Sequence, residues 1–162
     1  MWGNRRVHVL VDFLPRDEAG SAQRAAAAGA PRMNKFQDGK ILQDLETLLN
    51  SKGGLQAFRG FLRSEFSEEN LRFWQACEDY RLSPAGLQKL KASSIYSQFI
   101  SPDAPLEVNL DAETREALLD VMDSPCGHTF KEAQQRIYSL MAKDSFPRFL
   151  RSPHCPEALR AF

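Results

Sequence analysis

The sequence has few cysteines, and nothing in their spacing predicts a disulfide framework. Only three occur among the 162 residues, Cys77, Cys126 and Cys155, and their spacing is unpaired. An odd count of unpaired cysteines is typical of a reducing compartment. We therefore expect a cytoplasmic protein, and a peripheral position at the inner face of the plasma membrane stays open as an alternative.

Long apolar runs and phosphate-binding loops are also lacking. No run approaches the roughly 20 apolar residues that span a bilayer. His8 and Asp12 interrupt the apolar stretch Val7–Leu14, which is therefore too short and too polar for a signal peptide. Neither GxxxxGK followed by Ser or Thr nor GxGxxG occurs, so we do not expect the chain to bind a nucleotide itself.

An excess of charge of one sign is absent too. The 21 Lys and Arg balance the 21 Asp and Glu, which argues against a broad nucleic-acid surface. Residues 1–40 carry seven basic and four acidic side chains and have linker composition, so we expect a basic, largely flexible leader. Either this leader is a solvated tail, or it contacts anionic lipid weakly.

From Ile41 onward, apolar residues recur at helical spacing, and no segment alternates long enough with period two to predict a strand. The pattern predicts an all-α body of seven to nine helices. We expect Gly53 and Gly54 to end the first helix. We expect the segment Asp144–Pro147 to end a late helix that begins near Phe130.

One turn contains the most informative cluster of polar residues. Ser67 can cap a new helix through its hydroxyl, with Glu68 and Glu69 in the first turn, where the helix dipole favours negative charge. Asn70 occupies the position at which a capping box places Glu or Gln. Its shorter amide closes such a box poorly, so we expect the Asn70 side chain to face outward.

Other caps are predicted further along the chain. Asp111 is expected to cap one helix, and Thr129 with Glu132 matches a capping box for the next. Ser145 is expected to cap a short last helix. These residue types at helix ends satisfy backbone N–H groups that have no partner in the first turn.

Catalytic and metal-binding arrangements are poorly supported. Cys126–His128 and His154–Cys155 match no standard zinc spacing, and Cys126 with His128 lacks the geometry of a nucleophile and base. Glu68 and Glu69 are neighbours on a helix and point about 100° apart, which excludes an acid–base dyad. We expect neither a metal nor a cofactor. Polar groups remain at three helix ends, and they are either ordinary caps or parts of one binding surface.

Three sequence blocks together resemble the regulator of G-protein signalling (RGS) domain. The first is Phe61–Glu78 and the second is Glu107–Asp111. The third is Ala133–Met141, followed by Lys143–Leu150. They occur in the family's order and spacing, and the resemblance covers about residues 41–156.

The resemblance implies a nine-helix bundle in two subdomains over residues 41–156, followed by a tail at 157–162. It implies a monomer that is not itself an enzyme. Its partner would be the α subunit (Gα) of a heterotrimeric G protein of the Gi/o or Gq class, in its GTP-bound or transition-state form. The chain would accelerate GTP hydrolysis on Gα by holding the switch loops, without donating a catalytic arginine. The alternative is a non-catalytic scaffold with this fold that binds Gα or a receptor.

The resemblance also implies which residues contact Gα. Asn70 would lie beside the water-positioning glutamine of Gα, and Leu140 would help to form a pocket for a switch threonine. Arg148 would pair with Asp144, one helical turn away, and hold that acid in position. The full set of expected contact residues is Phe66, Ser67, Glu69, Asn70, Asn109, Leu140, Asp144, Ser145 and Arg148.

Overall fold

The computed structural model describes residues 35–156, and every regular element in that range is helical. The elements in chain order are α3 (Lys35–Leu49), α4 (Lys52–Ser64), α5 (Glu68–Arg81), α6 (Ala85–Ile95), η2 (Tyr96–Ile100), α7 (Ala112–Asp120), α8 (Lys131–Leu140), η3 (Met141–Ser145) and α9 (Phe146–Leu150). The all-α prediction is confirmed, whereas the count of nine helices for the whole chain stays a prediction.

The start of the helical body differs from the expected one. Helix α3 begins at Lys35, six residues before the expected first helical position at Ile41. Most of the expected basic leader, its membrane contact and the tail at 157–162 lie outside the described residues. None of the helices in the described range is long and apolar enough to cross a bilayer.

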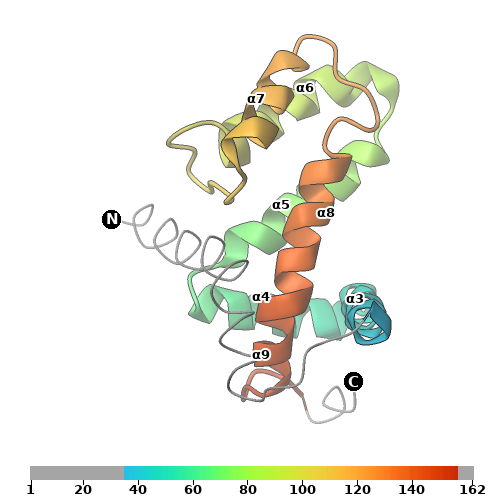
Figure 1. Ribbon diagram of the computed structural model, residues 1–162, viewed down its shortest axis with the longest axis vertical. Helices are drawn as coiled ribbons and strands as arrows, with labels where there is room; N and C mark the ends of the chain where they lie inside the picture. Colours follow the sequence, from blue (N-terminus) through green and yellow to red (C-terminus); the bar gives the residue numbers. More distant parts are fainter. Residues whose placement is uncertain (1–34, 157–162) are drawn as a thin grey trace.

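One continuous helical spine organises the described residues (Figure 1). It consists of α8, η3 and α9, which follow one another without a break. Helices α3 and α4 lie across its α9 end, whereas α6 and α7 lie towards its α8 end (Figure 1). Helix α5 packs along α8 and connects the two groups. This division agrees with the two subdomains that the resemblance implies.

Aromatic rings fix α4 against the α9 end of the spine. Phe58 is fully buried and meets Phe149 edge-on, with ring centroids 5.3 Å apart. The Phe146 ring also packs edge-on against Phe58, with ring centroids 6.4 Å apart. Such pairs add about 0.5–1.5 kcal/mol beyond the burial of their area. The end of α4, and the turn that follows it, are therefore held rigidly beside α9.

The predicted end of the late helix at Asp144–Pro147 is wrong. Proline lacks an N–H and its ring clashes with the carbonyl four residues earlier, which normally breaks a helix. Here the five residues of η3 widen the helix into a π-helical turn, which accommodates the proline without ending the helix. Ser145 makes no capping hydrogen bond, because no free helix start exists there.

The expected capping box at the start of α8 is also wrong. The helix begins at Lys131, so Thr129 lies before its cap position. The Thr129 hydroxyl instead accepts the N–H of Cys126 at 2.8 Å and closes the preceding turn. The cap at Asp111 is confirmed, since its carboxylate accepts the Thr114 N–H at 2.7 Å.

Gly53 and Gly54 do not end a helix but lie in the first turn of α4, which Ser51 caps. The reason is close packing. A Cβ atom at position 54 would lie 2.6 Å from Leu48 Cδ1 and 2.8 Å from the Leu48 carbonyl oxygen. Glycine at this position lets α4 approach the end of α3.

We predict that Gly54→Ala destabilises the domain by roughly 1–3 kcal/mol through overpacking. Gly60→Ala is the matched control in the same helix, because a Cβ there meets nothing within 4 Å. The control should gain up to about 1 kcal/mol from helix propensity. Urea unfolding of both variants measures the difference, and equal effects would contradict the packing role of Gly54.

Candidate binding surface at the helix ends

The turn between α4 and α5 is unusually tight, and Phe66 is its central residue. The N–H of Ser67 donates to the Leu62 carbonyl at 2.9 Å, and that of Phe66 donates to the Arg63 carbonyl at 3.1 Å. This pair of bonds is the Schellman motif, which usually has glycine at the left-handed position. Phe66 adopts that conformation with φ of 59°. An exposed aromatic side chain is thus presented at the cost of backbone strain.

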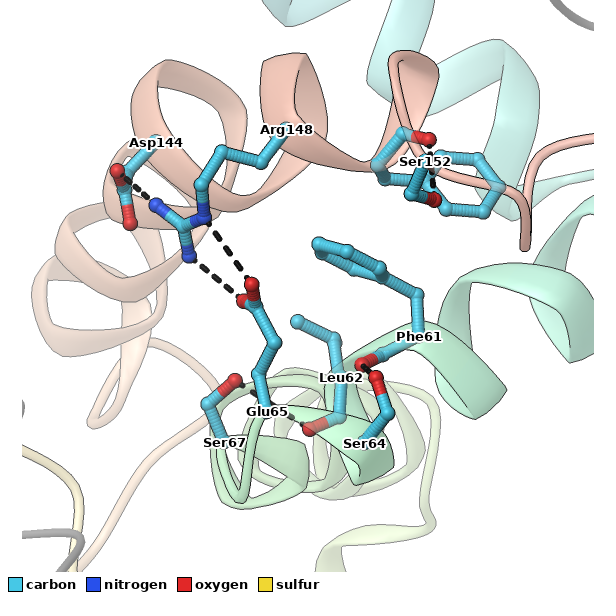
Figure 2. A network of polar contacts seen from close by, with 9 residues as sticks. Phe61, Leu62, Ser64, Glu65, Ser67, Asp144, Arg148 and Ser152 are labelled. Carbon is cyan, nitrogen blue, oxygen red and sulfur yellow. Dashed lines mark hydrogen bonds and ion pairs between the residues drawn. The ribbon is translucent and has the colours of Figure 1, made fainter.

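Ser67 does not cap α5 as predicted. Its hydroxyl lies 3.5 Å from the Leu62 carbonyl and points back to α4. This is a weak hydrogen bond by distance. The Schellman geometry explains the error, because it turns the chain so sharply that the N–H and the hydroxyl of Ser67 both face the Leu62 carbonyl. Figure 2 shows the contact of the hydroxyl.

The first turn of α5 is buried, so the prediction that Asn70 faces outward is wrong. Glu69 and Asn70 are each only 2% exposed. The tight turn brings this end of α5 against α4, and the neighbouring Leu71 and Phe73 are completely buried in the core. Asn70 Oδ1 accepts no hydrogen bond from the residues that the structure describes. A buried acceptor in this state costs about 1–3 kcal/mol.

Arg148 joins the spine to this turn (Figure 2). Its guanidinium contacts the Glu65 carboxylate twice, from Nε at 3.3 Å and from a terminal nitrogen at 2.8 Å. The expected pair with Asp144 is confirmed, since the other terminal nitrogen contacts that carboxylate. One cation therefore bridges two acids from separate parts of the chain. Planar guanidinium suits this arrangement, whereas a lysine ammonium does not.

The electrostatics keep this arginine charged. Burial lowers the pKa of Arg148, but hydrogen bonds and charges from Glu65 and Asp144 more than offset that effect, and the pKa lies above its ordinary value. Arg148 therefore keeps its positive charge between the two carboxylates. Glu65 was not among the expected site residues, because its partner lies 83 residues away in the sequence.

The remaining spine residues of the expected site lie close to this bridge in sequence but differ in exposure. Ser145 is buried at 4% exposure, and Leu140 is half-buried at the end of α8. Ser145 is the last residue of the π-helical turn η3, and Leu140 directly precedes that turn. The widened turn therefore sets the direction in which the side chains of this part of the spine point.

Asn109 lies in the irregular segment between η2 and α7, half-buried between the buried residues Val108 and Leu110. The end of that segment is tied to the spine, since Arg136 of α8 contacts the Asp111 carboxylate at 2.5 Å. Hydrogen bonds from Thr114, and to a smaller extent Arg136, lower the pKa of Asp111. Asp111 therefore both starts α7 and links the segment of Asn109 to α8.

The ion pair of Arg148 with Glu65 thus connects two of the three expected groups directly, namely the one at the start of α5 and the one on the spine. The third group, at Asn109, is joined to the spine only through its neighbour Asp111. A single contact surface formed by all three groups stays a prediction. Among residues 35–156 no cluster of three or more His, Cys, Asp or Glu side chains has the arrangement of a metal site.

Comparison with known protein families identifies this architecture. The model of the regulator of G protein signaling domain matches residues 44–156, which is more than half of the chain. The chain belongs to the RGS domain family. The match includes both ends of the Arg148 bridge and the segment that carries Asn109.

Individual relatives with this domain are similar over most of the chain. Human "Regulator of G-protein signaling 21" is 52% identical over 111 residues, which are 68% of this chain and 73% of the relative. Human "Regulator of G-protein signaling 18" is 42% identical over 137 residues, 84% of this chain but only 58% of the relative. "Regulator of G-protein signaling 1" from Xenopus tropicalis is 40% identical over 147 residues, covering 88% and 73%.

We predict that Phe66→Gly stabilises the RGS domain by about 0.5–1 kcal/mol, because glycine adopts the left-handed conformation without strain. Phe66→Ala is the control, since it removes the ring and keeps the strain. In thermal unfolding, the melting temperature of Phe66→Gly should therefore be higher than that of Phe66→Ala. Equal melting temperatures for the two variants would show that the backbone at Phe66 stores no strain.

We also predict that Glu65 and Arg148 are energetically coupled by about 1 kcal/mol, since the pair is bidentate and only partly exposed. A double-mutant cycle with alanine at each position measures the coupling. The control cycle uses Arg63 and Glu68, an ion pair across the same turn with Arg63 71% exposed. That pair should show no measurable coupling. Coupling of equal size in both cycles would refute a special role for Arg148.

Proposed function

We propose that the protein is a GTPase-activating protein for heterotrimeric G-protein α subunits. The observation that carries this proposal is the RGS-domain match over residues 44–156, because it includes every residue that the resemblance assigns to Gα contact. The names of the relatives point to the same pathway. The chain would not be an enzyme itself, since the bond that breaks belongs to GTP held by Gα.

The physical basis of the proposal is that Gα already holds most of the catalytic machinery. Its arginine stabilises charge in the transition state, and a glutamine orients the attacking water. Both groups lie on switch loops that move. A partner that binds the transition-state arrangement more tightly than the ground state lowers the barrier by that difference in binding free energy. Rigidity of the partner's contact surface is then the main requirement.

The bridge at Arg148 supplies such rigidity. It connects the spine with the turn that carries Phe66. The buried rings of Phe58 and Phe149 also hold α4, which leads into that turn, against the spine. A surface that is already ordered loses less conformational entropy on binding. More of the contact energy is therefore left for ordering the switch loops of Gα.

Asn70 has a property that suits contact with a glutamine. A side-chain amide can donate and accept hydrogen bonds at the same time. The buried Oδ1 of Asn70 accepts no hydrogen bond within the described part of the chain. In the proposed complex the Asn70 side chain turns outward, and an N–H donor from Gα satisfies this oxygen. That interaction offsets a cost already present in the free domain, so it favours the complex.

The proposal extends to the class of partner and the place of action. We propose a Gα subunit of the Gi/o or Gq class, bound by one copy of the chain in the cytoplasm. The excess of basic residues in 1–40 supports a weak attraction to anionic lipid near membrane-bound Gα. A panel of purified Gα subunits in one hydrolysis assay tests the class of partner.

We predict that Asn70→Ala lowers the acceleration of GTP hydrolysis by about 5- to 150-fold, as the loss of a buried polar contact worth 1–3 kcal/mol implies. Single-turnover hydrolysis on a Gi-class subunit measures it. Asn50→Ala, at an exposed asparagine after α3, is the matched control and should accelerate hydrolysis as the unmodified chain does.

The outcomes of this experiment separate two failures. If the unmodified chain does not accelerate hydrolysis on any Gα of the panel, the proposed function is wrong. If it does and Asn70→Ala is equally active while folded, only the role of Asn70 is wrong. Circular dichroism and the melting temperature establish folding of each variant.

A further inference from the structure

The segment that carries Asn109 has little regular structure of its own. Between η2 and α7 its backbone N–H groups donate back to η2 from Ser101, Leu106 and Val108, to the carbonyls of Tyr96 at 2.9 Å, Gln98 at 2.9 Å and Phe99 at 3.0 Å. A segment of this kind normally samples several conformations. Contacts from a neighbouring helix would hold the backbone around Asn109 in one conformation.

Arg115 on α7 makes the contacts that fix this segment. Its Nε donates to the Leu110 carbonyl at 3.1 Å, and one terminal nitrogen donates to the Val108 carbonyl at 2.6 Å. The other terminal nitrogen donates to the Ile100 carbonyl at the end of η2. The guanidinium also pairs with Glu107 at 3.1 Å, which balances its charge. All three of its nitrogens thereby contact either this segment or the last residue of η2.

The contacts are placed on both sides of Asn109. The carbonyls of Val108 and Leu110 belong to the residues immediately before and after it, and both accept from the same guanidinium. The third carbonyl, of Ile100, fixes the start of the segment relative to its end. A planar cation with a fixed fork of donors can hold three carbonyls at once, and no other side chain has that geometry.

We propose that Arg115 is a positioning residue for Asn109 in the contact with Gα. Arg115 holds the carbonyls of the residues before and after Asn109, so Asn109 is presented to the partner from a fixed backbone position. The inference rests on the proposed GTPase-activating function. It differs from a general structural role, because the effect of Arg115 on hydrolysis passes through Asn109 alone.

The first test measures order in the isolated chain. Arg115→Met keeps the apolar stem and removes the donors. Hydrogen exchange at the amides of Val108 and Leu110 should become at least about tenfold faster, whereas amides in the middle of α5 keep their protection. Glu116→Gln, an exposed charge on the same helix, is the control and should change neither. Unchanged exchange around Asn109 in Arg115→Met would overturn the proposal whether or not the chain acts on Gα.

The second test is a double-mutant cycle read by single-turnover hydrolysis on a Gi-class Gα. Arg115→Met should lower the acceleration on the order of tenfold in the unmodified background, since misplacing a contact group by about 1 Å has effects of that size or larger. In the Asn109→Ala background the same change should have less than a twofold effect. Equal losses in both backgrounds would show a structural role only and overturn the proposal.

Arg115→Lys tests whether the planar set of guanidinium donors matters separately from the positive charge. Lysine keeps the positive charge beside Glu107 but cannot hold the three carbonyls together. Its acceleration should fall close to that of Arg115→Met, and full activity of Arg115→Lys would overturn the proposal. Because lysine keeps the charge and the stem, this variant also serves if Arg115→Met fails to fold. Absence of acceleration by the unmodified chain would instead refute the proposed function, and the exchange measurement would still decide whether Arg115 orders the segment.

Discussion

The candidate surface depends first on one guanidinium shared between two acids. Arg148 holds Asp144 one turn away on the spine and Glu65 in the turn before α5. The edge-on contact of Phe58 with Phe149 also holds α4 against the spine. An ion pair at a partly exposed position contributes little to stability on average. Its importance here is geometric, because it sets the position of the turn that presents Phe66 relative to the spine.

The spine extends this principle to the other end of the surface. Arg136 on α8 reaches Asp111, and Arg115 on α7 holds the segment before it. Arginines on helices thus hold both irregular segments, the turn before α5 and the segment before α7. Arginine is well suited to this use, since one planar cation satisfies several carbonyls or carboxylates. The helical frame can therefore hold residues between the helices, such as Phe66 and Asn109, in fixed positions.

Periodicity and composition predicted the helical class, and the RGS resemblance predicted the Asp144–Arg148 pair, because both depend on spacing within one helix or one family motif. The predictions were wrong where a contact with a residue elsewhere in the fold overrode the preference of the local sequence. Gly54 reads as a helix end, but the close approach of Leu48 requires it inside α4. Asn70 reads as exposed, but the tight turn at Phe66 buries it. Glu65 could not be assigned without knowing that Arg148 lies beside it.

The central claim is that three separated segments form one rigid contact surface for Gα. Hydrogen exchange of the chain, alone and bound to Gα with GDP and aluminium fluoride, tests it most directly, since that form mimics the transition state. We expect slower exchange in residues 65–71, 106–110 and 141–148 together, with α6 unchanged. Protection confined to one of these segments, or centred on α6 and α7, would contradict the account.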